Sequence, residues 1–545
     1  MSKVAFYLQE HLLGEVMTSS DAKSYFSTDN SILSIDPLLV VYPRNENDVR
    51  KTARFVWQLA ERGKIIPITA RGAGTDQTGA AIGSGMILAF TAHMYRILEF
   101  DSKTGMVKIE PGINFGKLQQ SLHTHGRFLP PMPSSGEYST VGGAVANNAS
   151  GSNLVKYGDF KNYVSKLRVV LANGEVIVTG RLSARELNKK LGLTTFEGEI
   201  YRNLDTLVEE EIETIRKQDM PVVKNNAGYN LIDIKRKDGS FDLTPLFIGS
   251  QGTLGIVTEI EALSANYNPE TVLLMAFCDN TEQLQNIVQE LKELPSVPSS
   301  IEVVDGNLLS EAVSINPNAL TELIEKPYPS FVVFVEFDIA AERQLKKMIK
   351  KANKILSNHA SNVRIEYDKS EQDKLWKIRD TSSYVMSHNN ESSRSIPLIG
   401  GGAVPINNLA KYIDGIYKLF EKTTLPPAIW GHIGDGIVHL QPRLDIAQVG
   451  DRQKVFRLIE DYVELVKSLG GTISGEGNDG RLFTPSLHNV YPTELLDLFV
   501  KVKNIFDPYN LLNPGIKFDT TTDDLKNLLR HEYKLSKLYD HLPRN

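Results

Sequence analysis

The sequence predicts an α+β protein in which an α/β region precedes an antiparallel sheet covered by helices. The first observation is a strand–helix–strand pattern, with an apolar strand at 38–42, a helix at 45–61 and a strand at 64–68. The apolar residues of that helix recur at spacings of four, three and four, which is typical of one buried helical face. The second observation is a set of strands separated by long helices, at 272–277, 331–337 and 362–367.

The remaining elements follow from shorter patterns. In the first half, turn-bounded apolar runs predict strands at 86–90, 106–109, 167–171, 176–178, 246–248 and 254–260. Asn173-Gly174 predicts a hairpin between two of them. Residues 1–16 and the charged segment 182–220 are expected to be helical. The helices of the second half are expected at 281–293, 340–357 and 406–421.

Length and composition exclude several classes of protein. A chain of 545 residues is long enough for roughly three or four folding units. The net charge is −6 and basic residues are dispersed, so neither nucleic acid nor a polybasic membrane contact is expected. Apolar runs are too short to cross a bilayer, and the N-terminus does not resemble a signal peptide. One cysteine, Cys278, excludes an intrachain disulfide and an all-cysteine iron–sulfur cluster. We expect a cytoplasmic protein.

A glycine-rich loop follows the first strand–helix–strand unit and reads Arg71-Gly72-Ala73-Gly74-Thr75-Asp76-Gln77-Thr78-Gly79. Gly72 and Gly74 allow the backbone to approach a diphosphate closely, and Thr75 and Thr78 can add hydroxyl donors. The third glycine of a Rossmann fingerprint would stand at Gln77, and no helix signal follows the loop, so a nicotinamide site is disfavoured. A plain structural turn remains the alternative interpretation.

Small residues are also dense in three later segments, at 133–135, 140–151 and 247–257. Side chains of this size cannot fill a core, so they indicate close approach of another group to the backbone. Together with the loop at 71–79 and the later Asn513-Pro514-Gly515, these segments resemble FAD-linked oxidases of the vanillyl-alcohol-oxidase type. The resemblance is to the branch of D-lactate, glycolate and D-2-hydroxyglutarate dehydrogenases, and it covers most of the chain.

The resemblance implies a PCMH-type fold, in which FAD lies between two α/β subdomains beneath a cap domain. We therefore expect a helical segment at 1–33, an FAD-binding domain at 34–266, a cap domain at 267–500 and a return to the FAD domain at 501–545. FAD is expected to be bound without a covalent link. The residues implied to bind it are Arg71, Gly72, Ala73, Gly74, Thr75, Asp76, Gln77, Thr78, Pro133, Ser134, Thr140, Gly143, Asn148, Gly151, Ile256 and Asn513.

A second motif, Trp430 to Leu440, contains two histidines around a glycine-rich turn. A turn at Asp435-Gly436 would let His432 and His439 face each other across a hairpin at about 5 Å. Two imidazoles and a carboxylate are a suitable ligand set for zinc or manganese, and Glu476 is the candidate carboxylate. The alternative is that both histidines only stabilise the turn. The resemblance favours a divalent metal held by His432, His439 and Glu476.

Three departures from the family pattern affect the same region. Gly477 stands where relatives usually carry a histidine after the metal-binding glutamate. Three glycines at 400–402 replace charged residues before a Val-Pro pair, and Ile437 replaces an asparagine of the histidine motif. The metal ligands are therefore kept, whereas the residues that transfer protons are changed.

The resemblance also implies a reaction. Arg379 would bind the carboxylate of a D-2-hydroxy acid, because a guanidinium can contact both oxygens at once. The α-hydrogen would leave as a hydride to flavin N5. The base stays open among His432, His439, Asp479 and a metal-held hydroxide. The electron acceptor would be a quinone, a cytochrome or a separate electron-transfer protein, which leaves a peripheral membrane contact open. Rival interpretations are an alcohol or sugar oxidase of this fold and a flavin-binding protein without catalysis.

Overall fold

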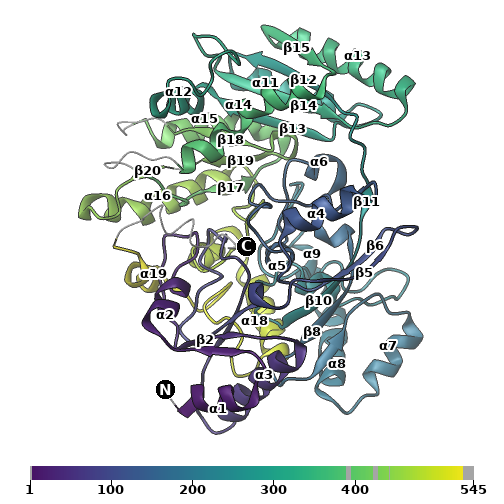
Figure 1. The fold of residues 1–545 in the computed structure, drawn as a ribbon, viewed down its shortest axis with the longest axis vertical. Helices are drawn as coiled ribbons and strands as arrows, with labels where there is room; N and C mark the ends of the chain where they lie inside the picture. Colours follow the sequence, from purple (N-terminus) through teal and green to yellow (C-terminus); the bar gives the residue numbers. More distant parts are fainter. Residues whose placement is uncertain (1–2, 388–393, 422–426, 441, 532–545) are drawn as a thin grey trace.

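The computed structural model describes residues 3–387, 394–421, 427–440 and 442–531. Figure 1 shows a large sheet with its helices at one end of the molecule and two smaller sheets at the other. We call the seven-stranded sheet the large sheet. The described residues contain no helix that is both long and apolar enough to cross a bilayer.

The first smaller sheet has four strands in the order β1-β2-β4-β3. Its strands are β1 Glu15–Met17, β2 Leu39–Tyr42, β3 Ile68–Arg71 and β4 Met86–Ala89, and helices α1 Lys3–His11, α2 Ser20–Phe26 and α3 Glu46–Ala60 accompany them. The predicted helix is confirmed, with Asn45 as its N-cap. The strand predicted at 64–68 is wrong, since β3 starts at its last residue. Pro67 has no N–H to donate and Ile65 is 50% exposed, so pairing begins only at Ile68.

The second smaller sheet is antiparallel and has the order β5-β6-β10-β8-β9. Its strands are β5 Ile97–Asp101, β6 Met106–Ile109, β8 Val164–Val170, β9 Val176–Val178 and β10 Ile256–Leu263. The predicted hairpin is confirmed, because β8 pairs with β9 and Gly174 has a φ of +82°. The strand predicted at 246–248 is wrong. Thr244–Phe247 forms the short helix α10, which Pro245 suits because proline is favoured in a first turn.

Helices and short strands make up the rest of this half of the chain. The predicted helical segment 182–220 is confirmed as α7 Ala184–Leu191, α8 Phe196–Glu210 and α9 Ile212–Arg216. The glycine-rich segment 140–151 contains a helix that the sequence patterns did not predict. The other elements of this half are η1 Phe90–Ala92, α4 Phe115–His123, β7 Arg127–Phe128, α5 Val141–Asn147, α6 Leu154–Tyr157, η2 Phe160–Asn162 and β11 Ala265–Asn266.

The large sheet is antiparallel, with the order β15-β12-β14-β13-β18-β19-β17. Its strands are β12 Val272–Cys278, β13 Ser300–Asp305, β14 Phe331–Phe337, β15 Asn362–Glu366, β17 Gly400–Ala403, β18 Ile429–Gly431 and β19 Ile437–Leu440. The three predicted strands are therefore confirmed. A further two-stranded sheet pairs β16 Arg394–Ser395 with β20 Arg443–Leu444.

Both faces of the large sheet are covered by helices, so alternate residues of one strand enter different cores. Val272 and Leu274 face one core, whereas Leu273 and Met275 face the other. The first core is covered by α11 Thr281–Lys292, α13 Glu342–His359, α15 Leu409–Leu419 and α16 Val449–Ser468. The second is covered by α12 Gly306–Ile315 and α14 Lys369–Ser387. The helices predicted at 281–293, 340–357 and 406–421 are confirmed, the last beginning as η3 Ile406–Asn408.

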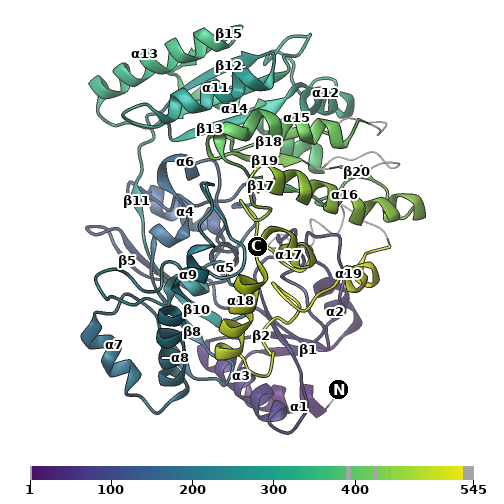
Figure 2. The same cartoon turned by 180° about the vertical axis from the view of Figure 1, so that it is seen from behind.

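The chain then returns to the smaller sheets. Helix α18 Thr493–Phe506 lies beside α8 in Figure 2 and shares its core, although most of it precedes the boundary expected at 500. Lys503 and Asp507 form a buried pair at its end, and Lys503 also donates to two backbone carbonyls. The other elements of this return are η5 Thr484–Ser486, α17 Leu487–Val490 and α19 Thr522–Leu528.

Basic residues are less evenly dispersed than the sequence analysis expects. The outer face of α13 is exposed and carries six of them within twelve residues, at Arg343, Lys346, Lys347, Lys350, Lys351 and Lys354. Its apolar residues Met348, Ile349 and Leu356 are buried against the large sheet. The charge therefore gathers on one face of one amphipathic helix.

The packing of α18 yields a stability prediction. Gly228 has a φ of +64°, and a Cβ there would lie 2.0 Å from Phe499 of α18. Gly228→Ala should therefore destabilise the protein through both backbone strain and a steric clash. Gly239 is the matched control, because its φ is +77° and a Cβ would meet nothing within 4 Å. We expect Gly239→Ala to cost about 1–2 kcal/mol and Gly228→Ala clearly more, in urea unfolding. Equal losses would contradict this packing.

Candidate functional site

Two adjoining cavities lie where the glycine-rich loop meets the large sheet. The large cavity has a volume of about 470 Å³ and the small cavity about 110 Å³. They share the residues Gly74, Thr75, Asp76, Ser139, Gly143 and Asn147. From these shared residues the small cavity extends toward β3 and β10, and the large one toward the histidine motif. The two cavities together therefore form one elongated site.

The glycine-rich loop is shaped by close contacts within the protein. A Cβ at Gly72 would lie 2.0 Å from Thr140 Oγ1, the hydroxyl that caps helix α5, and Gly74 has a φ of +78°. Only glycine avoids the steric clash at position 72 and adopts the positive φ at position 74 without strain. Asp76 accepts the backbone N–H groups of Thr78 at 2.9 Å and Ala80 at 2.8 Å. The Thr78 hydroxyl, which the sequence pattern offers as a donor to a diphosphate, bonds to Asp76 in this structure.

The structure brings most of the expected FAD-binding residues to these cavities. The residues that line one or both are Arg71, Gly72, Ala73, Gly74, Thr75, Asp76, Gln77, Thr78, Pro133, Ser134, Thr140 and Gly143. The side chain of Arg71 is nevertheless turned into the protein, where Nη1 donates to the carbonyls of Thr28 and Ala81. Its contribution to the lining is therefore mainly backbone.

Four expected residues are not among the described lining residues. Asn148 has a φ of +47° at the end of α5 and donates to Asp159 and Asn226. A Cβ at Gly151 would lie 2.0 Å from the Met132 carbonyl. The remaining two are Ile256 and Asn513.

Ile256 and Asn513 have evident packing roles. Ile256 is buried in the core of the four-stranded sheet, and its neighbours Gly255 and Val257 line the small cavity instead. This follows from alternation along a strand. Asn513 links three segments by hydrogen bonds. Its side-chain amide donates to the carbonyls of Ala80 and Gln251 and accepts from the Thr69 hydroxyl.

Ser139 lines both cavities and was missed by the sequence analysis. It is 4% exposed and its Oγ is a buried polar atom without a hydrogen-bond partner among the described residues. Such atoms are rare in folded proteins and require an explanation. A polar ligand in the shared part of the cavities would supply the missing partner. No motif marks a single serine of this kind in a sequence.

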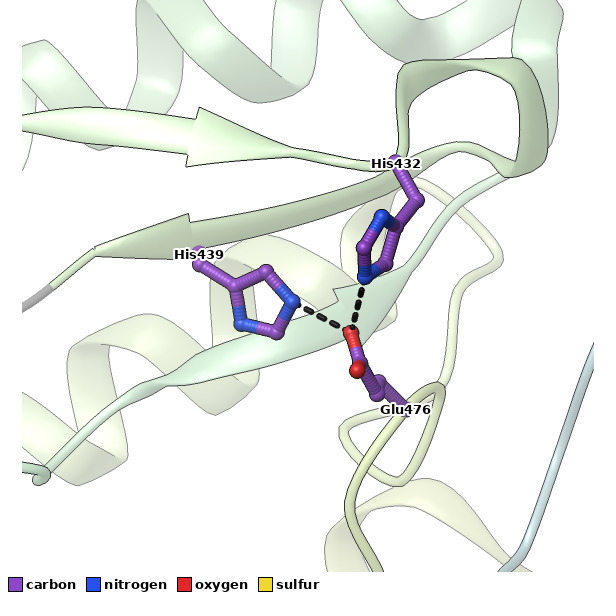
Figure 3. Close-up of side chains that lie close together, drawn as sticks. All are labelled: His432, His439 and Glu476. Carbon is purple, nitrogen blue, oxygen red and sulfur yellow. Dashed lines mark hydrogen bonds and ion pairs between the residues drawn. The ribbon is translucent and has the colours of Figure 1, made fainter. Parts of the chain in front are cut away.

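His432, His439 and Glu476 converge at the far end of the large cavity. Figure 3 shows His432 beyond the end of β18, His439 on β19 and Glu476 on a loop, with both rings directed at one carboxylate oxygen. His432 Nε2 lies 2.9 Å from Glu476 Oε2, and His439 Nε2 bonds to the same oxygen. One ligand atom from each residue lies within 4.8 Å of the others. This geometry suits a divalent ion.

The two histidines are close, but they are not the cross-strand pair that the sequence analysis expects. Their ring centroids are 5.4 Å apart, whereas the partner of His439 on the neighbouring strand β18 is Trp430. The turn is longer than two residues, since Ile433–Asp435 forms a 3₁₀ turn that ends at Gly436 with a φ of +70°. His432 therefore reaches the site from the turn itself.

Glu302 on β13 contacts this group and was also missed. Its Oε1 lies 2.5 Å from His432 Nδ1, and its Oε2 accepts the Nε–H of Arg379 at 2.8 Å. Burial lowers the pKa of His432, but the carboxylates of Glu302 and Glu476 outweigh burial and raise it to about 10. Burial raises the pKa of Glu476, but both histidines outweigh it and hold the pKa well below its usual range. A cation is thus strongly favoured among these carboxylates.

Arg379 lies on α14 and lines the large cavity. It is 9% exposed, and its described hydrogen bonds use Nε, to Glu302, and Nη1, to Ser382 at 2.9 Å. The carboxylate that pairs with Arg379 is that of Glu302 on β13. The guanidinium is therefore held rigidly at the wall of the cavity.

The three departures from the family pattern fall around this group. Gly400 of β17 pairs with His439, and the Gly401 carbonyl accepts the backbone N–H of Glu476 at 2.8 Å. A Cβ at Gly401 would lie 3.6 Å from the His439 ring, so the glycines bring β17 close to the site. A Cβ at Gly477 would meet nothing within 4 Å, which leaves open space beside Glu476. Ile437 is fully buried.

Asp479 is placed differently from the role that the sequence analysis offers it. It is fully buried and is not among the described lining residues. One oxygen accepts the Ser474 hydroxyl, and the other accepts the Gly228 N–H at 2.8 Å and lies 3.0 Å from Lys517 Nζ. Both oxygens are therefore engaged in holding the loop that carries Glu476.

Comparison with known proteins identifies the fold and the family. Residues 37–180 match the model of an FAD binding domain, and residues 268–516 match the C-terminal domain of FAD-linked oxidases. The structure superposes on 4-ethylphenol oxidase from Gulosibacter chungangensis with a TM-score of 0.70 at 15% identity, covering 96% of this chain and 99% of that one. The chain belongs to the PCMH-type, or vanillyl-alcohol-oxidase-type, FAD-linked oxidoreductases.

The similar curated proteins act on hydroxy acids, according to their names. D-2-hydroxyglutarate dehydrogenase of Escherichia coli is 28% identical over 93% of this chain, and this chain spans about half the length of that relative, 50%. D-lactate dehydrogenase of Archaeoglobus fulgidus is 26% identical over 92% of this chain and 96% of its own length. Glycolate oxidase subunit GlcD of Bacillus subtilis is 27% identical over 88% of this chain and 89% of its own.

The described residues fit FAD. The glycine-rich loop leaves its backbone beside the junction of the two cavities, and the unpartnered Ser139 hydroxyl faces the same place. Because the site consists of two adjoining cavities, each cavity can hold one end of a dinucleotide. The described histidines that line the cavities are His432 and His439, and both belong to the candidate metal-binding group with Glu476.

We therefore predict a yellow protein whose flavin is released by acid. After acid precipitation, flavin absorbance should appear in the supernatant, because the cavities supply contacts without a covalent attachment. Flavin that stays with the pellet would contradict non-covalent binding. Colourless protein that takes up no added FAD would contradict the fit itself.

Proposed function

We propose that this protein is an FAD-dependent dehydrogenase that oxidises a D-2-hydroxy acid to the 2-oxo acid with the help of a divalent metal. The observation that carries the proposal is the lining of the large cavity. Arg379, the group His432–His439–Glu476 and the glycine-rich loop all line this one space. A carboxylate-binding cation, a metal-binding group and a flavin site thus surround the same substrate position.

The donor set supports the metal. His432 and His439 would supply imidazole nitrogens and Glu476 a carboxylate oxygen, a combination that suits zinc or manganese. His432 donates its other ring N–H to the carboxylate of Glu302, an arrangement common among metal-binding histidines. A metal bound there would act as a Lewis acid toward the hydroxyl of the substrate. FAD would accept the hydride from the carbon that bears this hydroxyl.

The residues of the chain would orient the substrate and release its proton. Arg379 would bind the carboxylate through the edge that includes Nη2, since its described bonds within the protein use Nε and Nη1. Asp479 is not suited to act as the base, because Lys517 and two further donors hold it. The space beside Gly477 is where relatives carry their usual histidine, and we expect slow proton transfer to solvent there.

The electron acceptor completes the proposal. One cysteine cannot hold an iron–sulfur cluster within these 545 residues. Electrons would therefore pass from FAD to a quinone, a cytochrome or a separate electron-transfer protein. We propose a cytoplasmic location, with a peripheral membrane contact if the acceptor is a quinone.

The metal group can be tested by removing single ligands. His432→Ala and Glu476→Ala should each lose the divalent metal but retain FAD, because the loops at 71–78 and 133–143 are unchanged. The control is His359→Ala. This change breaks another histidine–glutamate pair, in which His359 of α13 lies 2.6 Å from Glu290 of α11. Elemental analysis should find metal in the wild type and in this control. A wild type without metal that is also indifferent to chelators would contradict the metal assignment.

The substrate class can be tested by anaerobic reduction of the flavin. D-lactate, D-2-hydroxyglutarate or glycolate should bleach it, whereas a matching alcohol without the carboxylate should not. Arg379→Lys should lower kcat/KM by roughly ten- to a hundred-fold, since a bidentate charged contact contributes about 1.5–3 kcal/mol. Arg364→Lys, on the half-buried arginine of β15 that pairs with Glu366, is the control and should resemble the wild type.

Gly477→His tests whether the missing histidine limits proton transfer. The open space beside Gly477 can accept a side chain, and a histidine there should raise turnover of the hydroxy acid. Faster turnover of a neutral alcohol, with Arg379→Ala equal to the wild type, would instead identify an alcohol or sugar oxidase. A flavin that no substrate of either class reduces would identify a binding protein without catalysis.

A further inference from the structure

Glu302 is a buried residue that contacts two functional groups at once, Arg379 and His432. It lies on β13 in the middle of the large sheet, and its side chain is 1% exposed. β13 and β18 are antiparallel, and Val303 is paired with Gly431. Glu302, which precedes Val303, therefore lies opposite His432, which follows Gly431. Cross-strand neighbours are close enough for direct contact. The register of the sheet therefore places this carboxylate beside a histidine of the metal-binding group.

The same carboxylate meets the substrate arginine from another element. Helix α14 packs on the face of the large sheet that carries Val304 and Trp430, through Leu375 and Ile378. Arg379 follows Ile378 and directs its Nε to Glu302 Oε2 at 2.8 Å, while His432 Nδ1 lies 2.5 Å from Oε1. The two oxygens of one side chain thus hold two groups from different elements.

A buried carboxylate is costly unless charged or hydrogen-bonding partners compensate it. Arg379 and His432 supply this compensation, and in return Glu302 fixes both of them. With an N–H at Nδ1 directed at Glu302, the Nε2 of His432 is left to face Glu476 and the metal site. With Nε of Arg379 occupied, the guanidinium cannot turn away from the cavity that it lines.

We propose that Glu302 is a positioning residue that fixes the metal ligand His432 and the substrate arginine Arg379 relative to each other. This inference rests on the proposed function, because it requires a metal at His432 and a carboxylate at Arg379. It adds a structural reason for substrate choice. The distance between the hydroxyl and the carboxylate of the substrate must match the distance that Glu302 sets between the two groups.

Glu302→Gln is the informative variant because it keeps the shape and removes the second acceptor. An amide has one carbonyl oxygen, so its NH₂ must face a donor of either His432 or Arg379. We expect metal affinity, measured by chelator competition, to fall roughly ten- to a hundred-fold, the usual effect of removing such a partner. We also expect the KM for the hydroxy acid to rise, with FAD content unchanged.

Asp305→Asn is the matched control. Asp305 is buried on the same strand, where it caps α12 and accepts the Tyr417 hydroxyl at 2.8 Å, away from the large cavity. Its loss should lower stability but leave metal affinity and KM near wild-type values. This comparison separates positioning from the general cost of changing a buried carboxylate. If Glu302→Gln proves unstable, Glu302→Asp is the substitute, because it keeps the charge but is too short to reach both His432 and Arg379. We then expect the loss of one contact, so that either metal affinity falls or the KM rises more strongly than the other quantity changes.

A double-mutant cycle then tests the link itself. If Glu302 positions Arg379, the penalty of Arg379→Lys on KM should shrink to a few-fold in the Glu302→Gln background, because the guanidinium is already displaced. Additive penalties together with unchanged metal affinity in Glu302→Gln would overturn the inference and leave the proposed function intact. A wild type that neither binds metal nor is reduced by a hydroxy acid would overturn both.

Discussion

The site depends on a continuous series of buried charges that runs from α14 to the loop at 474–481. Arg379 contacts Glu302, Glu302 contacts His432, and His432 and His439 both contact Glu476. Each carboxylate in this series is compensated by a cationic or N–H donor, as buried charges require. Removing one member leaves its neighbour uncompensated. The positions of the arginine and the metal ligands are therefore linked rather than independent.

The rest of the fold presents this series to the flavin site. The large sheet supplies Glu302, His432 and His439 from adjacent strands and the turn between two of them. The returning chain supplies Glu476, held by the buried pair of Asp479 and Lys517. Because the same return packs α18 against α8, the segment bearing Glu476 is anchored to the half of the molecule that carries the glycine-rich loop.

Much of this arrangement could be predicted from the sequence. Periodicity located most strands and helices, and the spacing of His432 and His439 indicated that both would reach one site. Periodicity failed at Thr244–Phe247, where a fully buried apolar run does not distinguish a short helix from a strand. Glu302 and Ser139 could not be found, because their roles arise from strand register and from packing between distant segments. Asp479 was one of several candidate bases in the sequence, but Lys517, thirty-eight residues away, engages its carboxylate.

In the proposed function, the flavin and the metal group share one cavity. The most direct test is anomalous diffraction from crystals grown with FAD and Mn²⁺. We expect an anomalous peak between His432 Nε2, His439 Nε2 and the Glu476 carboxylate, with the flavin ring in the same cavity and its diphosphate beside Gly74. A metal bound elsewhere, or a flavin outside the two adjoining cavities, would contradict it.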